Sequence, residues 1–243
     1  MKTILLLFFL SLVYSESYSQ LEPSEYLSFG IRATEGRDYE DAINYLTQYL
    51  NTDPQNPVAR YNRAVSYYFT RDFNDALQDA TIAVTNNPQY KEAFNIRGLI
   101  YTSLQMYADA ISDFNSAIFN DPDFAEAYFN RALVYKIQNE YPEAISDLNN
   151  ALTINSALIE AYLTRGEVLV SMGNYDQAIQ DLNTYISNIQ NKAAAYSARG
   201  LAYYQIGNFG NAVTDLEKAI NINPELANDF NQVLTDAKNK QTK

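Results

Sequence analysis

Five arginines that recur every 34 residues each have an aspartate sixteen residues further along the chain. The pairs are Arg63 with Asp79, Arg97 with Asp113, Arg131 with Asp147, Arg165 with Asp181, and Arg199 with Asp215. Guanidinium and carboxylate groups form bidentate ion pairs, and the same groups can bind charged ligands. The arginines lie among apolar residues, as Arg131 does between Tyr128 and Tyr135. These pairs are therefore candidates either for a ligand site or for a structural framework.

The regular recurrence of the pairs favours the structural role. One further segment of the chain has Phe29 and Tyr45 at the two positions, so both charges are lost together. This joint loss indicates that each arginine pairs with the aspartate that follows it. A row of five similar pairs makes a poor catalytic centre, and structural charge networks also perturb pKa values. We interpret the ten residues as structural ion pairs, with ligand binding as the alternative.

Few residues remain for other catalytic chemistry. The 243 residues include no His and no Cys, which removes imidazole bases, thiol nucleophiles and the usual zinc ligands. Glu126, Glu160 and Glu167 could cluster as the paired carboxylates of a glycan-acting enzyme, which stand about 5–10 Å apart. Glutamate on a helix surface is ordinarily solvated, however, and no glycine-rich phosphate loop or metal-ligand motif occurs. The sequence predicts a protein that is not an enzyme and needs no metal or cofactor.

The sequence repeats with a period of 34 residues, and this period sets the spacing of the Arg–Asp pairs. Pro54, Pro88 and Pro122 stand 34 residues apart, and small residues recur at the same interval. One set of small residues consists of Gly30, Ala64, Gly98, Ala132, Gly166 and Gly200. Apolar residues at helical spacing predict two amphipathic helices in each period, which the small residues allow to approach closely and the proline ends. One helix pair cannot bury both of its apolar faces, so neighbouring pairs must stack.

The stretches AYFNRALVYKIQNEYPEAISDLNNAL and AYSARGLAYYQIGNFGNAVTDLEKAININP resemble the tetratricopeptide repeat family. The resemblance implies an all-α fold, an α-solenoid of helix-turn-helix repeats that winds into a right-handed superhelix with a concave groove. Within a repeat domain over residues 20–226, it implies six repeats: 23–56, 57–90, 91–124, 125–158, 159–192 and 193–226. Residues 227–243 are predicted to form a C-terminal capping helix with a basic tail.

The resemblance also implies where a ligand would bind. Members of the family usually bind peptides or protein segments, and positions two, five, nine, twelve and thirteen of each first helix line the groove. The groove residues assigned in this way are Leu27, Tyr61, Val65, Tyr68, Asn95, Leu99, Phe129, Leu133, Lys136, Leu163, Glu167, Leu201 and Tyr204. Chaperone-binding members hold a C-terminal carboxylate with Lys, Asn and Arg, whereas several second positions here are glutamates. The alternative is that these side chains pack against each other across neighbouring repeats.

These residues predict a non-catalytic scaffold for protein–protein interaction. The expected partner is a peptide or helix with apolar anchors flanked by basic residues, because soluble monomers seldom expose large apolar patches. The alternative is a self-assembling structural protein, a homo-oligomer formed through the same surface. The net charge of −12 disfavours a nucleic-acid partner, since phosphates require Lys and Arg.

Residues 1–19 are predicted to be a secretory signal peptide. Lys2 precedes an apolar run from Ile4 to Val13, and small polar residues follow. Cleavage after Ser15 and cleavage after Ser19 both satisfy the small-residue preference. The run is shorter than the roughly 20 residues that span a bilayer, although an uncleaved anchor is the alternative. We expect an exported protein, periplasmic or secreted, with no membrane-spanning segment after cleavage.

Overall fold

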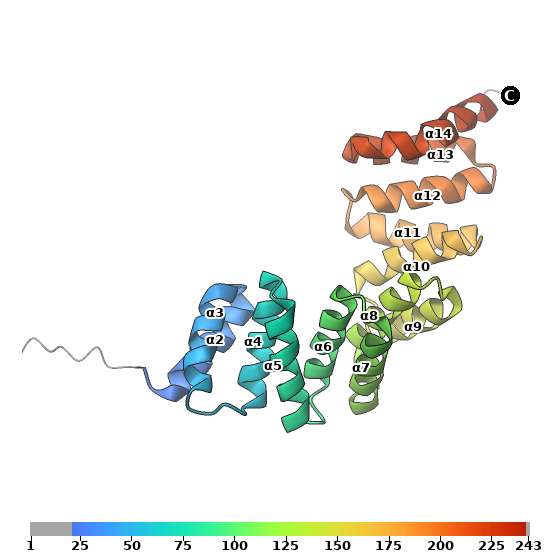
Figure 1. Cartoon of the computed structure of the whole chain (residues 1–243). Coiled ribbons are helices and arrows are strands. Elements are labelled where there is room, and N and C mark those ends of the chain that lie inside the picture. Colours follow the sequence, from blue (N-terminus) through green and yellow to red (C-terminus); the bar gives the residue numbers. More distant parts are fainter. Residues whose placement is uncertain (1–20, 242–243) are drawn as a thin grey trace, which may run out of the picture. The chain divides into compact units, whose positions relative to one another are not determined.

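The computed structural model describes residues 21–241, which are helical almost throughout and contain no strand (Figure 1). The signal peptide predicted over residues 1–19 lies outside the described part of the chain. The chain divides into two compact units, of which the first ends at Pro88 and the second begins at Gln89. Both units are built from antiparallel helix pairs.

The first unit holds two helix pairs. Its helices are α2 (Pro23–Gly36), α3 (Tyr39–Leu50), α4 (Pro57–Thr70) and α5 (Phe73–Asn86). Consecutive helices pack together, and the two first helices, α2 and α4, also contact each other. Ala42, Leu46 and Leu50 of α3 form a core with Ala59 of α4. The second helix of one pair therefore packs against the first helix of the next, as in a stacked repeat.

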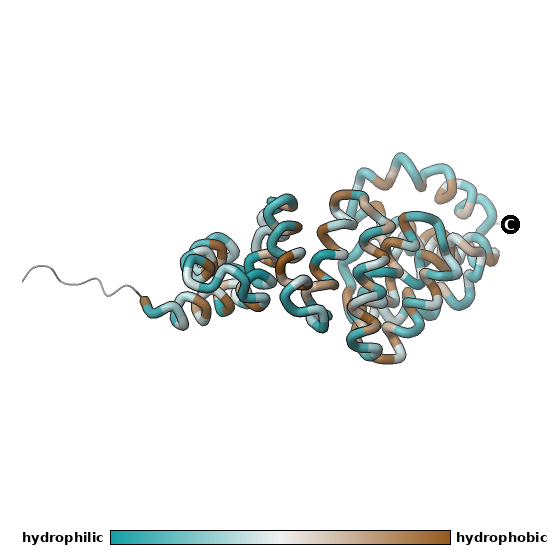
Figure 2. Tube along the Cα trace, turned by 60° about the horizontal axis from the view of Figure 1, so that its bottom comes forward, coloured by the Kyte–Doolittle hydropathy of each residue, from teal (hydrophilic) through white to brown (hydrophobic). Residues whose placement is uncertain are grey.

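The second unit continues this pattern with four more helix pairs among the described residues. Its helices are α6 (Lys91–Ser103), α7 (Tyr107–Asn120), α8 (Ala125–Ile137), α9 (Tyr141–Ile154), α10 (Ile159–Ser171), α11 (Tyr175–Asn188), α12 (Ala193–Gln205), α13 (Phe209–Ile222), the 3-10 turn η1 (Pro224–Leu226) and α14 (Ala227–Gln241). The first helices α6, α8, α10 and α12 contact one another in series, and α14 packs against α13. Hydrophobic and hydrophilic residues are interspersed along the helices, as is typical of amphipathic helices (Figure 2).

Small residues set the distance between the two helices of a pair. A Cβ atom built on Gly98 would lie 2.6 Å from the ring of Phe114, and one on Gly30 would lie 2.5 Å from Leu46 Cγ. Both distances are far below an ordinary carbon–carbon contact of about 3.5–4.0 Å. The close approach expected at these positions is therefore present, and the large residue sixteen positions later occupies the space that a side chain would need.

We expect Gly98→Ala to lower the free energy of unfolding by about 1–2 kcal/mol, because the added methyl group overpacks the core against Phe114. The combination of Gly98→Ala with Phe114→Leu should recover part of that loss, since it reproduces the pair Ala132 and Leu148, which pack together in one cluster. Urea unfolding followed by circular dichroism measures both variants. A double variant that is no more stable than Gly98→Ala would show that the clash with Phe114 is not the cause.

Candidate functional site

The structure brings all five Arg–Asp pairs together, and each pair joins the two helices of one repeat. Each arginine Nε donates to the aspartate Oδ2, at 2.6 Å between Arg63 and Asp79 and at 2.7 Å in the other four pairs. The arginine Nη2 donates to the second oxygen of the same carboxylate, as from Arg97 to Asp113 at 2.7 Å. The arginine side chains are 14–21% exposed and the aspartates 2–10%. The pairs are therefore bidentate and largely buried.

In four of the five arginines, the remaining guanidinium nitrogen links the repeat to the one before it. Nη1 of Arg165 donates to Asn149 Oδ1 at 2.7 Å, and Nη1 of Arg199 donates to Asn183 Oδ1 at 2.6 Å. Equivalent bonds run from Arg131 to Asn115 and, within the first unit, from Arg63 to Thr47. These acceptors were missed by the sequence analysis, although they too stand sixteen residues from an arginine. Each of these four arginines thus holds three helices of two repeats in register.

Aromatic rings and buried charge complete the environment of these arginines. The guanidinium carbon of Arg131 lies 5.6 Å from the ring centre of Tyr128 and 6.0 Å from that of Tyr135. Burial on its own lowers the pKa of Arg131, but the hydrogen bonds and charge of Asp147 outweigh it and raise the pKa overall. No buried side-chain N or O atom of the described residues lacks a hydrogen-bond partner. This arrangement suits a framework better than an acid–base centre.

The predicted groove residues lie on the first helices of both units. In the first unit, Leu27 on α2 and Tyr61, Val65 and Tyr68 on α4 are all partly exposed. In the second unit we define the first-helix face by its partly exposed members, which are Asn95, Leu99, Phe129, Leu133, Lys136, Glu167 and Leu201. Because α6, α8, α10 and α12 contact one another in series, these residues form one layer of the second unit.

Leu163 does not belong to this face. Its side chain is only 6% exposed and lies in a core cluster with Leu182 and Tyr185. Leu163 therefore contributes little exposed surface to the predicted groove, because its side chain packs in the core formed by α10, α11 and α12. Leu99 and Phe129 are partly buried against core clusters of their own. For these two side chains, packing within the solenoid accounts for much of their apolar character.

Polar contacts tie the first helices to one another. Lys136 of α8 forms an ion pair with Glu167 of α10, and Asn130 Nδ2 donates to Asn95 Oδ1 at 2.9 Å. Tyr204 is in contact with the C-terminal helix α14, because its hydroxyl donates to Asp236. Tyr204 is thus engaged by α14 and contributes less to a ligand surface than its place on α12 predicts.

Two of the three glutamates considered for acid catalysis have partners of their own. Glu167 pairs with Lys136, and Glu160 accepts a hydrogen bond from the Tyr185 hydroxyl at 3.2 Å. Burial, with the charge of Glu160, raises the pKa of Tyr185 to about 12, so the phenol keeps its proton and donates. Among residues 21–241 no group of acidic side chains is arranged to hold a metal ion. Glu160 and Glu167 therefore take part in contacts between neighbouring helices.

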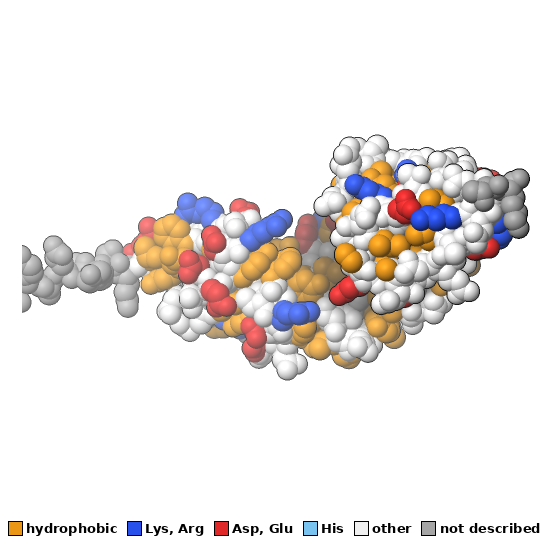
Figure 3. Space-filling model, turned by 90° about the horizontal axis from the view of Figure 1, so that it is seen from above, with side chains coloured by type: hydrophobic (Ala, Val, Ile, Leu, Met, Phe, Trp, Pro, Cys, Tyr) orange, Lys and Arg blue, Asp and Glu red, His pale blue; other side chains and the backbone are white. Residues whose placement is uncertain are grey.

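Exposed apolar side chains add to the first-helix face at places that the predicted set did not include. Ile137 is 52% exposed and follows Leu133 by one turn of α8. It occupies position thirteen of its first helix, so the family pattern could have identified it. Hydrophobic side chains reach the surface among acidic and basic ones (Figure 3).

Within the described part of the chain, no helix has the length and apolar character needed to cross a bilayer.

Solved structures share the fold of this chain. A crystal structure of the MamA protein is 26% identical, with a TM-score of 0.61, and the match covers 71% of this chain and 94% of MamA. YrrB, described as a TPR protein with an unusual peptide-binding site, is 21% identical with a TM-score of 0.65, over 80% of this chain and 97% of YrrB. PilF from Pseudomonas aeruginosa is 15% identical with a TM-score of 0.73, over 90% of this chain and 97% of PilF. No curated protein sequence matches the chain.

Matches to protein-family models assign the chain to a family. Tetratricopeptide repeat models match residues 125–157, 159–191 and 193–226, and a TPR repeat model matches residues 98–138. Together these matches cover more than half of the chain. They confirm the expected all-α solenoid of helix-turn-helix repeats, and repeats of this type generally serve as non-catalytic scaffolds for protein interaction. The chain belongs to the tetratricopeptide repeat family.

Proposed function

We propose that this protein binds a segment of a partner protein on the first-helix face of its second unit. The observation that carries this proposal is the pair Leu133 and Ile137, which stand one turn apart on α8 and leave apolar surface exposed. A few well-packed side chains near the centre of an interface carry most of its binding energy. The ion pair of Lys136 and Glu167 beside them would form part of a polar rim.

The overall charge favours a partner segment that carries basic residues. The chain has 29 acidic and 17 basic residues, so its field attracts positive charge and speeds association at low salt. An amphipathic helix or an extended peptide with apolar anchors and flanking Lys or Arg matches both the surface and the charge. Such a partner also accounts for apolar side chains that the solenoid itself leaves half covered.

A peptide selection with a matched pair of variants tests the site. Peptides selected from a displayed library against residues 20–243 would be measured by calorimetry. We expect Leu133→Glu with Ile137→Glu to weaken binding about 100-fold, since two apolar anchors are replaced by buried charge. Phe119→Glu is the matched control and should leave the affinity unchanged. Phe119 is 87% exposed, but it lies on the second helix α7 and outside the first-helix face.

Unchanged affinity in the Leu133→Glu, Ile137→Glu variant, with circular dichroism showing intact helices, would contradict the proposed site. The self-assembly alternative has a different signature, because it predicts a molecular mass that rises with protein concentration and falls back in this variant. Sedimentation velocity over a range of concentrations measures that mass directly.

We also propose that the protein is exported, on the sequence features of residues 1–19 alone. The expected product begins at Gln20, or at Glu16 if cleavage follows Ser15. The intact mass of the protein recovered from the exported fraction of a bacterial host distinguishes the two sites. Recovery only from the cell interior, with Lys2 and the apolar run still attached, would contradict export.

A further inference from the structure

A cavity of about 290 Å³ lies beside the Arg165–Asp181 ion pair of the second unit. Ile145 and Leu169 supply apolar side chains to its wall, and the amides of Gln177 and Gln180 line its edge. Three helices contribute, because Ile145 belongs to α9, Leu169 to α10 and the two glutamines to α11. The cavity contains no residue of the first-helix face, so it is distinct from the proposed partner site.

The cavity occurs in the repeat that lacks a tyrosine four residues after its arginine, where the ring of Tyr162, three residues before Arg165, lies 5.6 Å from the guanidinium carbon. Four residues after the arginine, the other repeats with this pair have a tyrosine whose ring centre lies 5.7–6.0 Å from the guanidinium carbon. These tyrosines are Tyr67, Tyr101, Tyr135 and Tyr203. The corresponding residue here is Leu169, which has no ring and is itself 5% exposed. The space beside the guanidinium is therefore left open.

The Arg165–Asp181 ion pair is also more exposed than the other pairs, as expected where Leu169 replaces a tyrosine. Arg165 is 21% exposed and Asp181 is 10% exposed, whereas the other four arginines are 14–18% and their aspartates 2–6%. Nε and Nη2 of Arg165 donate to Asp181 and Nη1 donates to Asn149, so each guanidinium nitrogen already makes a hydrogen bond. The planar guanidinium also stacks on aromatic rings, and Leu169 stands where the other repeats place a tyrosine against it.

We propose that this cavity binds the aromatic side chain, tyrosine or phenylalanine, of a partner polypeptide. The ring takes the place that the chain's own tyrosine occupies in the other repeats, between the guanidinium face of Arg165 and the apolar atoms of Ile145 and Leu169. The amides of Gln177 and Gln180 hydrogen-bond the backbone on either side of the bound residue. These amides distinguish a polypeptide from a free aromatic molecule, because each glutamine offers both a donor and an acceptor.

Leu169→Tyr tests the proposal by filling the cavity from within. Because tyrosine stands at this position in four other repeats, the variant is expected to fold. The probes are the blocked tripeptides acetyl-Gly-Tyr-Gly-amide and acetyl-Gly-Leu-Gly-amide, with p-cresol as the free aromatic molecule. NMR follows the Arg165 Nε–H signal and the side-chain amides of Gln177 and Gln180. We expect the tyrosine peptide to shift these signals in the native protein and to bind at least about tenfold more weakly to Leu169→Tyr.

Tyr135→Leu provides a reciprocal test of the ring position alone, because it leaves only Tyr128 against Arg131, while Glu143 and Ser146 stand where the cavity has Gln177 and Gln180. The tyrosine peptide is then expected to shift the Arg131 Nε–H signal, which it leaves unchanged in the native protein. Equal binding of the tyrosine peptide to Leu169→Tyr, or equal shifts from the leucine peptide, would overturn the proposal. Binding of p-cresol as tightly as the tyrosine peptide would also overturn it, since the cavity would then take free aromatic molecules. The Leu133→Glu, Ile137→Glu variant should bind the tyrosine peptide as the native protein does, which separates this site from the first-helix face.

Discussion

Replacing Arg131 with Met is expected to lower the free energy of unfolding by about 3–5 kcal/mol, because it leaves the buried carboxylate of Asp147 without its partner. Asp147 is only 5% exposed and takes two hydrogen bonds from Arg131, through Nε at 2.7 Å and Nη2 at 2.6 Å. The same substitution removes the donor to Asn115 in the preceding repeat. Urea unfolding followed by circular dichroism measures the loss.

The combination of Arg131→Met with Asp147→Leu separates the cost of leaving Asp147 unpaired from the net contribution of the ion pair to stability. Apolar residues of similar volume often replace a buried ion pair at little cost in stability, so the double variant should recover much of the loss. Lys218→Met is the control for removal of a positive charge, since Lys218 is exposed on α13, and it should change stability by less than about 0.5 kcal/mol. If the single and double variants are equally destabilised, the pair is not a buried framework contact.

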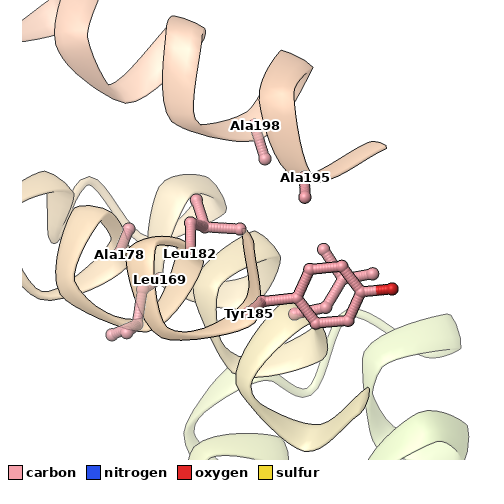
Figure 4. Close-up of a cluster of buried hydrophobic side chains, with 7 residues drawn as sticks. Leu169, Ala178, Leu182, Tyr185, Ala195 and Ala198 are labelled. Carbon is pink, nitrogen blue, oxygen red and sulfur yellow. The ribbon is translucent and has the colours of Figure 1, made fainter. Parts of the chain in front are cut away.

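Replacing Tyr185 with Ala should cost about 3–5 kcal/mol, since it removes a large, fully buried side chain from the core. Tyr185 is 1% exposed and packs in a cluster with Ala195 and Ala198 of α12, as Figure 4 shows. These alanines are too small to fill the space left by the ring. Thermal and urea unfolding of Tyr185→Ala measure the cost, and a loss below about 1 kcal/mol would show that the neighbouring helices close the cavity.

Tyr185→Phe isolates the hydroxyl group and should cost only about 0.5–1.5 kcal/mol, because it removes one hydrogen bond to Glu160. The pKa of Tyr185 is raised to about 12 from the ordinary value of 10.0, first by burial and then by Glu160. The folded state therefore keeps a proton that the unfolded chain releases, so the associated stability is complete below pH 10 and declines as the pH rises toward 12. Tyr185→Phe should lose less stability than the native protein over that pH range, and an identical decline in both would contradict this assignment.

Much of the framework follows from the 34-residue period, because the period places the same residue types at the same helical positions. The repeated spacing of Arg131 and Asp147, with the joint loss of both charges at Phe29 and Tyr45, was enough to predict their pairing. The asparagine acceptors such as Asn115 and Asn149 were not predicted. They are polar residues on an exposed helix surface, and only the stacking of one repeat on the next turns them toward an arginine.

The burial of a side chain is harder to predict from sequence than the face of the helix on which it lies. Leu163 and Leu133 both occupy first-helix positions of the groove pattern, but Leu163 is buried because Tyr185 and Leu182 of α11 pack around it. The periodicity likewise gave no sign that the structure divides between Pro88 and Gln89. The cavity beside Arg165 depends on the single change from tyrosine to Leu169, which the sequence shows but whose effect on the surface requires the packed helices.

The binding surface itself can be tested by NMR of methyl-labelled protein with a selected peptide. If a partner segment binds the first-helix face, the methyl signals of Leu133, Ile137 and Leu201 should shift on addition of the peptide. Those of Leu148 and Leu216, which are fully buried on second helices, should remain in place. Shifts confined to side chains of the second helices, such as Ile118 on α7 and Ile154 on α9, would contradict the account and place the binding surface on the opposite layer of the solenoid.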